Sequence, residues 1–193
     1  AFPQSRLMPE TRLAIARTHV MDGSWVSSIL EYDRWGTNYP AHKSLSQAEF
    51  DRAWLNHQAG NSAKAFQLFT NYVEKFPANK LAPLAQKWVA DFHFQSGKFS
   101  QSEKSYRQIF ENTNYLNFSK DLIWEARLSA ARSAFFNQEY ETAQLLLDDI
   151  IKATNAPIDE VARAEFYLGD VISEQTDRTP TNLIEAVVHY QKV

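Results

Sequence analysis

Small side chains recur in pairs along this chain, and the two members of a pair stand twelve residues apart. The pairs are Ala16 and Ser28, Ala53 and Ala65, Ala90 and Ser102, and Ala131 and Ala143. A fifth pair, Gly169 and Ala186, is separated by seventeen residues. The first members follow one another at intervals of 37, 37, 41 and 38 residues. A repeat of this length is typical of stacked supersecondary units, so it predicts a solenoid rather than a single globular core.

The spacing of twelve has a mechanical explanation. Two antiparallel helices joined by a tight turn approach closely where both carry a small side chain, and the larger apolar residues around the crossing interlock. Gly23, Gly60 and Gly97 each fall in a short break between the members of a pair. Glycine tolerates the left-handed conformation that ends a helix, so these three residues are expected to end the first helix of their units. The fourth break has Asn137-Gln138 where the others have a glycine. We therefore predict an all-α fold of about five helix-turn-helix units, with ten helices.

Bulky residues keep the same register as the small ones. A large side chain follows the second small residue at the fourth position, which is the spacing of one helical face, in Tyr32, Phe69, Tyr106 and Leu147. The alternative is a chance recurrence of alanines in a helical chain. It explains the pattern less well, because the glycines and the aromatic residues share the register.

The expected units cover residues 9–40, 46–77, 83–113, 121–153 and 157–193, in one array that spans residues 1–193. Pro9 suits the first turn of a helix, and Pro180 suits the start of the last one, because a proline there has no needed amide to lose. The fifth unit has an enlarged turn between its two helices. Val193 falls within a helix by this register, so we expect the chain to be a fragment of a longer protein.

Composition excludes several classes of function. The chain has 193 residues, of which 44% are hydrophobic and 22% charged, and a net charge of −3, as expected of an ordinary folded protein. It has no apolar run long enough for membrane insertion. The balanced charge gives no footprint for nucleic acid. Because there is no cysteine, disulfides, thiolate metal sites and a cysteine nucleophile are excluded, while the compartment stays open.

Catalytic and metal-binding motifs are also missing from the sequence. It contains neither Gly-x-Ser-x-Gly nor His-Glu-x-x-His, and its five histidines are scattered. Neighbouring carboxylates such as Asp148 and Asp149 point about 100° apart on a helix and do not converge as an acid and a base would. We expect no catalytic residue, no metal and no cofactor.

The units resemble the tetratricopeptide repeat family, which has small residues at the eighth and twentieth places of a unit, glycine at the fifteenth and proline at the thirty-second. The second unit shows Ala53, Gly60, Ala65, Phe69 and Pro77 at the family's places. The resemblance implies a right-handed superhelical solenoid that binds a protein or peptide partner in its concave groove.

A narrower resemblance lies in residues 76–90, FPANKLAPLAQKWVA, and in Gly97-Lys98-Phe99. This stretch looks like the bacterial envelope branch of the family, which includes the lipoprotein of the β-barrel assembly machinery and the Tol-Pal-associated periplasmic coordinator. The resemblance implies a scaffold without catalytic residues, and it favours a periplasmic or envelope-associated protein over a cytoplasmic one.

In that family the first helix of each unit lines the groove. Matched residue by residue, the groove here holds Arg17, Phe50, Trp54, His57, Lys87, Asp91, Phe94, Arg132, Phe135, Phe166 and Asp170, together with Leu13, Val20 and Leu128. Trp54 is either an exposed anchor for a partner or an aromatic buried against the next unit. The family's clamp for a C-terminal carboxylate needs paired Lys and Asn. Its Asn places hold Arg17, Trp54 and Asp91 here, which puts that clamp in doubt.

Two functions follow from these observations. The first is a non-enzymatic interaction scaffold, and the alternative is a superhelical accessory region of a larger envelope enzyme. The last helix presents an apolar stripe with no sixth unit to cover it, made of Leu183, Ile184, Val187, Val188 and Tyr190. Terminal repeats normally have a polar outer face, so this stripe predicts weak self-association or binding of the chain's continuation.

Overall fold

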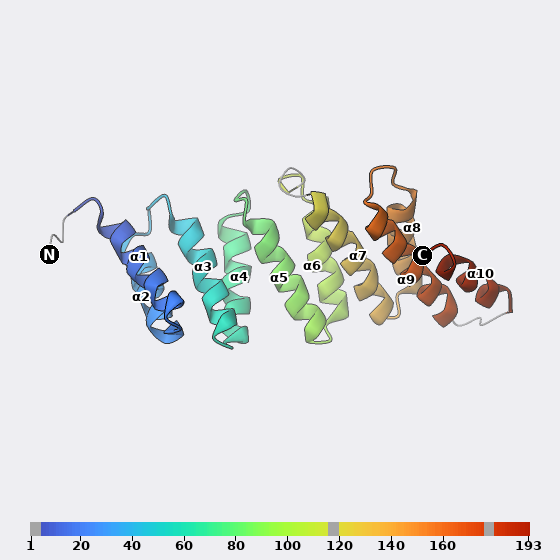
Figure 1. Ribbon diagram of the computed structural model, residues 1–193, viewed down its shortest axis with the longest axis horizontal. Coiled ribbons are helices and arrows are strands. Elements are labelled where there is room, and N and C mark those ends of the chain that lie inside the picture. The colour runs from blue at the N-terminus through green and yellow to red at the C-terminus, as the bar shows by residue number, and fades with distance from the viewer. Residues whose placement is uncertain (1–4, 116–119, 176–179) are drawn as a thin grey trace. The chain divides into compact units, whose positions relative to one another are not determined.

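The computed structural model describes residues 5–115, 120–175 and 180–193, and the chain is helical almost throughout these ranges (Figure 1). The helices are α1 (Met8–Met21), α2 (Trp25–Asn38), α3 (Leu45–Gln58), α4 (Ser62–Lys75), α5 (Ala82–Gln95), α6 (Phe99–Glu111), α7 (Lys120–Phe136), α8 (Tyr140–Lys152), α9 (Ile158–Glu174) and α10 (Pro180–Tyr190). No strand occurs in the described residues. The predicted ten helices and the all-α helical repeat solenoid are confirmed.

The chain divides into two compact units, Ala1–Ala85 and Gln86–Val193. In the first unit α1 packs on α2, α2 on α3 and α3 on α4. In the second unit the helices from α6 to α10 each pack on the next, and α7 also contacts α9. Within each unit these helices thus lie against their neighbours in the chain, and the α7–α9 contact joins helices of different pairs.

Four turns between paired helices have the same geometry. The second residue after each helix end has a positive φ: 76° at Gly23, 81° at Gly60, 69° at Gly97 and 62° at Gln138. The next residue donates its N–H to a carbonyl five positions back, in Ser24 to His19 (2.8 Å), Asn61 to Asn56 (2.8 Å), Lys98 to His93 (2.9 Å) and Glu139 to Ala134 (2.9 Å). This hydrogen bond is characteristic of the Schellman motif. Gln138 therefore makes the turn that the other three pairs make with glycine.

The small residues lie where the helices of a pair cross. Both members of each of the first four pairs are buried, from Ala16 and Ser28 to Ala131 and Ala143. The Ser28 hydroxyl donates to the carbonyl of Ala16 at 2.9 Å, and the Ser102 hydroxyl donates to that of Ala90 at 3.0 Å. Residues twelve apart therefore face each other, and the serine hydroxyl at a crossing is satisfied by the opposite backbone.

The last pair of helices is built differently. A Cβ placed on Gly169 of α9 would lie 2.5 Å from Cε1 of Tyr190, and the three atoms nearest to it all belong to the Tyr190 ring. The ring therefore occupies the space that a side chain at this position would need. As predicted, α10 begins at Pro180; part of the enlarged turn, residues 176–179, lies outside the described residues.

Candidate functional site

The aromatic residues of α3 supply the exposed part of the first unit's candidate face. Trp54 is 42% exposed, and its ring lies 5.4 Å from that of His57. Phe50, one turn earlier, is half-buried with its ring edge-on to Phe69 and Tyr72 of α4. Of the two readings of Trp54, the structure shows the exposed one, so its ring is accessible to a partner.

The Asp51 carboxylate of α3 is held by hydrogen bonds. Asp51 Oδ2 accepts a hydrogen bond from the Tyr32 hydroxyl at 3.1 Å, and Asp51 Oδ1 accepts one from Gln47 at 2.8 Å. The Arg17 guanidinium lies 3.9 Å from the same carboxylate. Burial and the neighbouring Asp51 charge raise the pKa of Tyr32 to about 12. The charge of Arg17 is thus partly balanced within the protein.

Two predicted groove residues on α5 form an ion pair in the second unit. Lys87 Nζ lies 3.0 Å from Asp91 Oδ2 and 3.2 Å from Glu125 Oε1. Burial alone would lower the pKa of Lys87, but the two carboxylates outweigh it and raise the pKa. The Tyr106 hydroxyl donates to Asp91, and burial together with that carboxylate raises the pKa of Tyr106. Lys87 and Asp91 therefore have their charges satisfied by the protein itself.

Arg132 on α7 is held by aromatic rings instead. Its guanidinium carbon lies 5.5 Å from the centre of the Phe94 ring and 5.3 Å from that of Tyr167. Its Nε is buried without a hydrogen-bond partner, and Arg132 makes no ion pair with any carboxylate in the described part of the chain. Stacking on aromatic faces fixes the plane of a guanidinium while leaving its charge available. The guanidinium is thus oriented by two rings, while the Asp170 carboxylate lines the same pocket without forming an ion pair with it.

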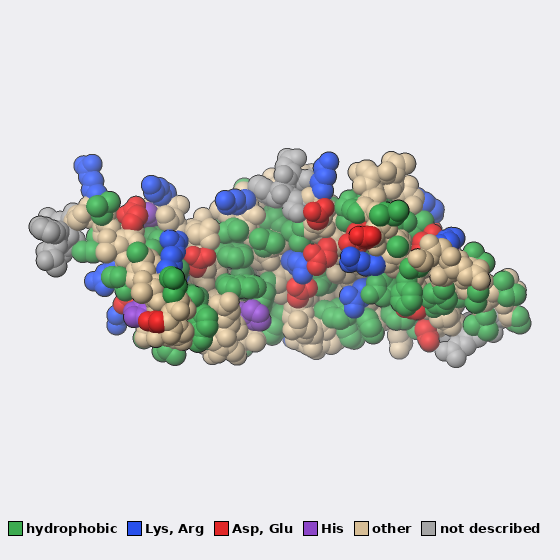
Figure 2. Space-filling view, viewed as in Figure 1, with side chains coloured by type: hydrophobic (Ala, Val, Ile, Leu, Met, Phe, Trp, Pro, Cys, Tyr) green, Lys and Arg blue, Asp and Glu red, His purple; other side chains and the backbone are tan. Residues whose placement is uncertain are grey.

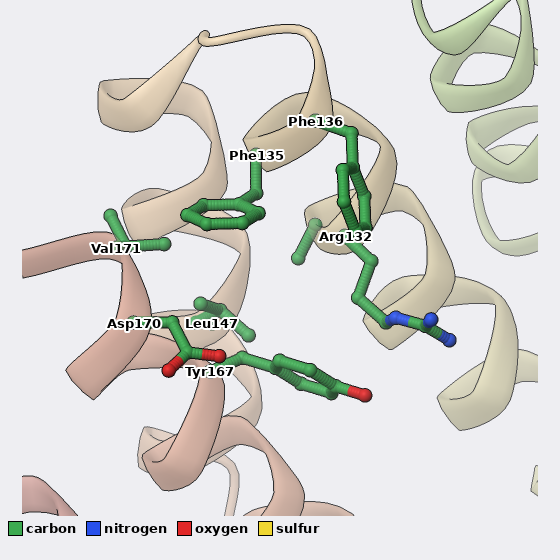
Figure 3. Close-up of a pocket in the computed structure, with 8 residues that line it drawn as sticks. Arg132, Phe135, Phe136, Leu147, Tyr167, Asp170 and Val171 are labelled. Carbon is green, nitrogen blue, oxygen red and sulfur yellow. The ribbon is translucent and has the colours of Figure 1, made fainter. Parts of the chain in front are cut away.

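A small pocket opens beside Arg132 between α7 and α9 (Figure 3). It has a volume of about 70 Å³ and is lined by Ala131, Arg132, Phe135, Phe136, Leu147, Tyr167, Asp170 and Val171. Figure 3 shows the Phe135 and Tyr167 rings facing the pocket. Cofactor sites usually enclose about 300–1,000 Å³, so this pocket is suited to a single apolar side chain.

Asp170 and Phe166 complete this part of α9. Asp170 Oδ1 accepts a hydrogen bond from the Tyr190 hydroxyl at 2.8 Å, which fixes the carboxylate at the pocket. Phe166 is exposed, and its ring contacts those of Tyr167 and Tyr190. The structure therefore brings Arg132, Phe135 and Asp170 together, with Phe94 supporting the arginine and Phe166 next to the pocket.

Two leucines matched to the groove are not available to a partner. Leu13 is 4% exposed and Leu128 is 5% exposed, and both belong to hydrophobic cores. Each precedes a crossing residue, Ala16 or Ala131, by three positions, which places it on the same side of the helix as the crossing. Their assignment to the groove was wrong for this reason. Val20 is half-buried against the core of the first unit.

Tyr167 was missed by the sequence analysis although it contacts Arg132 and lines the pocket. It directly follows Phe166, and neighbouring residues of a helix point about 100° apart, so the groove assignment of Phe166 gave no indication of Tyr167. Leu147, from α8, was identified only as the bulky residue four positions after Ala143. The signal that did identify candidate groove residues was the position directly after each crossing residue, which carries Arg17, Trp54, Asp91, Arg132 and Asp170.

In residues 5–115, 120–175 and 180–193, no group of three or more His, Asp or Glu side chains is arranged to hold a metal ion. None of the helices described there has the length and apolarity needed to cross a membrane.

Comparison with solved structures shows which fold the chain adopts. Tetratricopeptide-like repeats of a putative kinesin light chain from Podosopora anserina match with a TM-score of 0.65 and 12% identity, covering 98% of this chain and 96% of that one. RapI in its apo form matches with a TM-score of 0.70 and 13% identity over 94% of this chain and 51% of that one. A tetratricopeptide repeat protein from Parabacteroides merdae has a TM-score of 0.61 and 13% identity, covering 95% of this chain and 74% of that one.

No protein-family model matches the sequence, and no curated protein matches it either. At the low identities of the solved structures, the likeness concerns the fold alone. The chain therefore has the fold of tetratricopeptide repeat proteins, and its function has to be argued from its own residues.

Proposed function

We propose that the chain is a non-enzymatic protein-protein interaction scaffold that binds a peptide or partner segment in a concave groove. The observation that carries the proposal is the arrangement at α7 and α9, where an arginine oriented by two rings, with no ion-pair partner among the described residues, lines a small pocket with apolar walls. The partner segment would place an acidic side chain on Arg132 and an aliphatic side chain between Phe135 and Tyr167.

Charge explains why the acidic group would select Arg132. Lys87 is already paired with Asp91 and Glu125, and Arg17 lies near Asp51, whereas Arg132 has no described ion-pair partner. A carboxylate arriving at a guanidinium whose plane is already fixed forms charge-assisted hydrogen bonds with little further ordering of that side chain. This recognition differs from the family's clamp, which uses paired Lys and Asn.

The pocket residues favour binding over catalysis. Asp170 is the one carboxylate among the described residues that line the pocket, and it accepts a hydrogen bond from Tyr190. Among the described lining residues there is no Ser, Thr or His side chain to serve as a nucleophile or as a base beside it. In the first unit, the exposed Trp54 ring is a separate candidate anchor, of the aromatic type that dominates many interfaces.

Selection of short random peptides on the folded protein, followed by affinity measurement, tests this function. We expect the selected peptides to share an acidic residue next to an aliphatic one. Arg132→Gln should weaken their binding about tenfold or more, because hydrogen bonds to charged groups contribute about 1.5–3 kcal/mol.

The matched control is Arg127→Gln, which removes another ring-packed arginine of α7 that does not line this pocket. It should leave peptide affinity unchanged. The proposal fails if no peptide is selected, or if the two arginine variants weaken binding equally.

We also propose a periplasmic or envelope location, which is supported by the resemblance of residues 76–90 to envelope repeat proteins. Fractionation of the cells that make the protein tests it. Recovery in the cytoplasm would contradict it.

Weak self-association through α10 is the last part of the proposal. Figure 2 shows hydrophobic side chains gathered over this helix, and Leu183, Ile184, Val187, Val188 and Tyr190 are all exposed. A second copy of the chain could cover this stripe with the same stripe of its own, as in a two-fold symmetric contact.

A further inference from the structure

A second arginine of α7 is held between aromatic rings on a different side of the helix. The guanidinium carbon of Arg127 lies 4.7 Å from the centre of the Phe110 ring and 5.6 Å from that of Trp124. Its Nε is buried without a hydrogen-bond partner, and within the described ranges Arg127 makes no ion pair. Residues five apart on a helix point roughly 140° away from each other, so Arg127 and Arg132 serve different surfaces.

Arg127 lines an open pocket of its own, between the first half of α7 and the end of α8. The pocket has a volume of about 440 Å³ and is lined by Lys120, Ile123, Trp124, Arg127, Asp149, Ala153 and Asn155. The four α7 residues stand at spacings of three, four and seven, which form one helical face. The volume lies within the range of about 300–1,000 Å³ that small-molecule sites occupy.

The charges and the apolar surface of this pocket indicate the chemistry of its ligand. Lys120 and Arg127 carry positive charges and Asp149 carries a negative one, so the lining has a net charge of +1 (two cations minus one anion). Ile123 and the Trp124 ring supply an apolar wall beside the guanidinium. A ligand that joins an anionic group to a flat apolar body would satisfy both features at once.

We propose that this pocket binds a small aromatic carboxylate, with its carboxylate on Arg127 and Lys120 and its ring against Trp124. The Phe110 and Trp124 rings orient the guanidinium before the ligand arrives, so little side-chain freedom is lost on binding. The site is independent of the proposed peptide groove, because none of its residues lines the pocket beside Arg132.

The probe is 3-phenylpropionate, and the neutral 3-phenylpropionamide has nearly the same shape. The readout is the indole N–H signal of Trp124 in a two-dimensional NMR spectrum, identified by its loss in Trp124→Phe. We expect the carboxylate to shift this signal saturably with a dissociation constant of roughly 1 mM, as befits a ligand of this size. The amide should bind about tenfold more weakly or not at all.

Three variants determine whether the charges act as proposed. Arg127→Gln should weaken the probe about tenfold or more, because it removes a charged hydrogen-bond donor. The matched control Arg132→Gln should leave the affinity unchanged. Asp149→Asn should strengthen binding roughly two- to fivefold, because it removes the one carboxylate that repels the probe among the described lining residues.

The gain expected for Asp149→Asn cannot come from misfolding, so it keeps the test decisive even if Arg127→Gln disturbs the ring stack. Equal binding of the carboxylate and the amide would overturn the proposal. An unchanged affinity in Asp149→Asn, or an equal loss in both arginine variants, would also overturn it. A failure of the peptide selection would leave this outcome unaffected.

Discussion

The α5–α6 crossing and the α9–α10 crossing occupy equivalent places in the repeat, yet they are closed by different means. At the first, Ala90 and Ser102 are fully buried and the serine hydroxyl donates to the alanine carbonyl at 3.0 Å. Ser133 of α7 adds a hydrogen bond to Ser102 at 3.0 Å. At the second, the ring of Tyr190 lies directly on Gly169. Small residues close the inner crossing, whereas a large ring on a glycine closes the outer one.

The outer crossing also depends on polar side chains at the end of α10. Glu165 of α9 is only 7% exposed, and its carboxylate contacts His189 and accepts hydrogen bonds from Lys192 at 3.1 and 3.2 Å. Ala186 is the one buried residue of α10 among those described. A helix held by a few long side chains opens more readily than one held by close backbone packing. The comparison therefore predicts that a substitution at the α5–α6 crossing destabilises the whole unit, whereas one at the α9–α10 crossing affects α10 alone.

The largest effect is expected for Ala90→Leu, because a crossing without free volume cannot take three more carbons. Overpacking of this kind costs about 1–3 kcal/mol. In a chain of this length that cost lowers the melting temperature by several degrees, measurable by circular dichroism. Ala63→Leu, on the exposed surface of α4, is the control and should melt near the wild type. An Ala90→Leu protein that melts within about one degree of the wild type would contradict close packing at Ala90.

The same side chain at the equivalent place, Gly169→Leu, should release α10 without unfolding the rest. The new side chain displaces the Tyr190 ring and breaks its hydrogen bond to Asp170. Hydrogen exchange should show α10 amides exchanging nearly as in an unstructured segment, while α6 and α7 amides stay protected. In a Tyr190→Ala background the substitution should add little, because the two changes remove one contact. Loss of protection in α6 and α7 would mean that both crossings support the whole unit.

A smaller effect is expected for Glu165→Gln, which keeps the shape of the side chain and removes its charge. The amide cannot accept from Lys192 as strongly as the carboxylate does, and hydrogen bonds to charged groups contribute about 1.5–3 kcal/mol. We expect α10 amides to exchange about tenfold faster. Glu185→Gln, an exposed site on α10, makes the same chemical change away from the contact. Equal exchange rates of the α10 amides in the two variants would show that the Glu165 charge does not stabilise the packing of α10.

The crossings of the first four helix pairs could be predicted from the sequence because they obey a local rule. A spacing of twelve with a glycine in the turn fixes both the pairing and the closeness of two helices, and it identified Ala16, Ala53 and Ala90 directly. Gln138 shows the limit of that rule. It adopts the left-handed conformation with a φ of 62°, because the surrounding helix pair imposes the turn on a residue that does not favour this conformation.

The candidate site was less predictable, because its decisive contacts join helices of different pairs. Arg132 could be placed on an exposed stripe, one residue after Ala131. Its contacts with Phe94 and Tyr167 depend on how α5, α7 and α9 pack, which no spacing within a unit records. The ring contacts of Arg127 with Phe110 and Trp124 depend in the same way on how α6 and α7 pack.

The smallest effect on stability, and the one that tests the outer side of α10, is expected for Val187→Glu. Val187 is 49% exposed, so the substitution should change the stability of the monomer by less than about 0.5 kcal/mol. Its effect should appear in association. Each aliphatic residue buried between two copies contributes roughly 1.5–3 kcal/mol before the cost of association, which is enough for a weak dimer at high concentration.

Light scattering over a concentration series should show the wild type gaining mass and Val187→Glu staying monomeric. Val26 is an exposed residue of α2, so Val26→Glu adds the same charge elsewhere, and this variant should still self-associate. A wild-type protein that stays monomeric throughout would show that the stripe on α10 does not pair with a second copy.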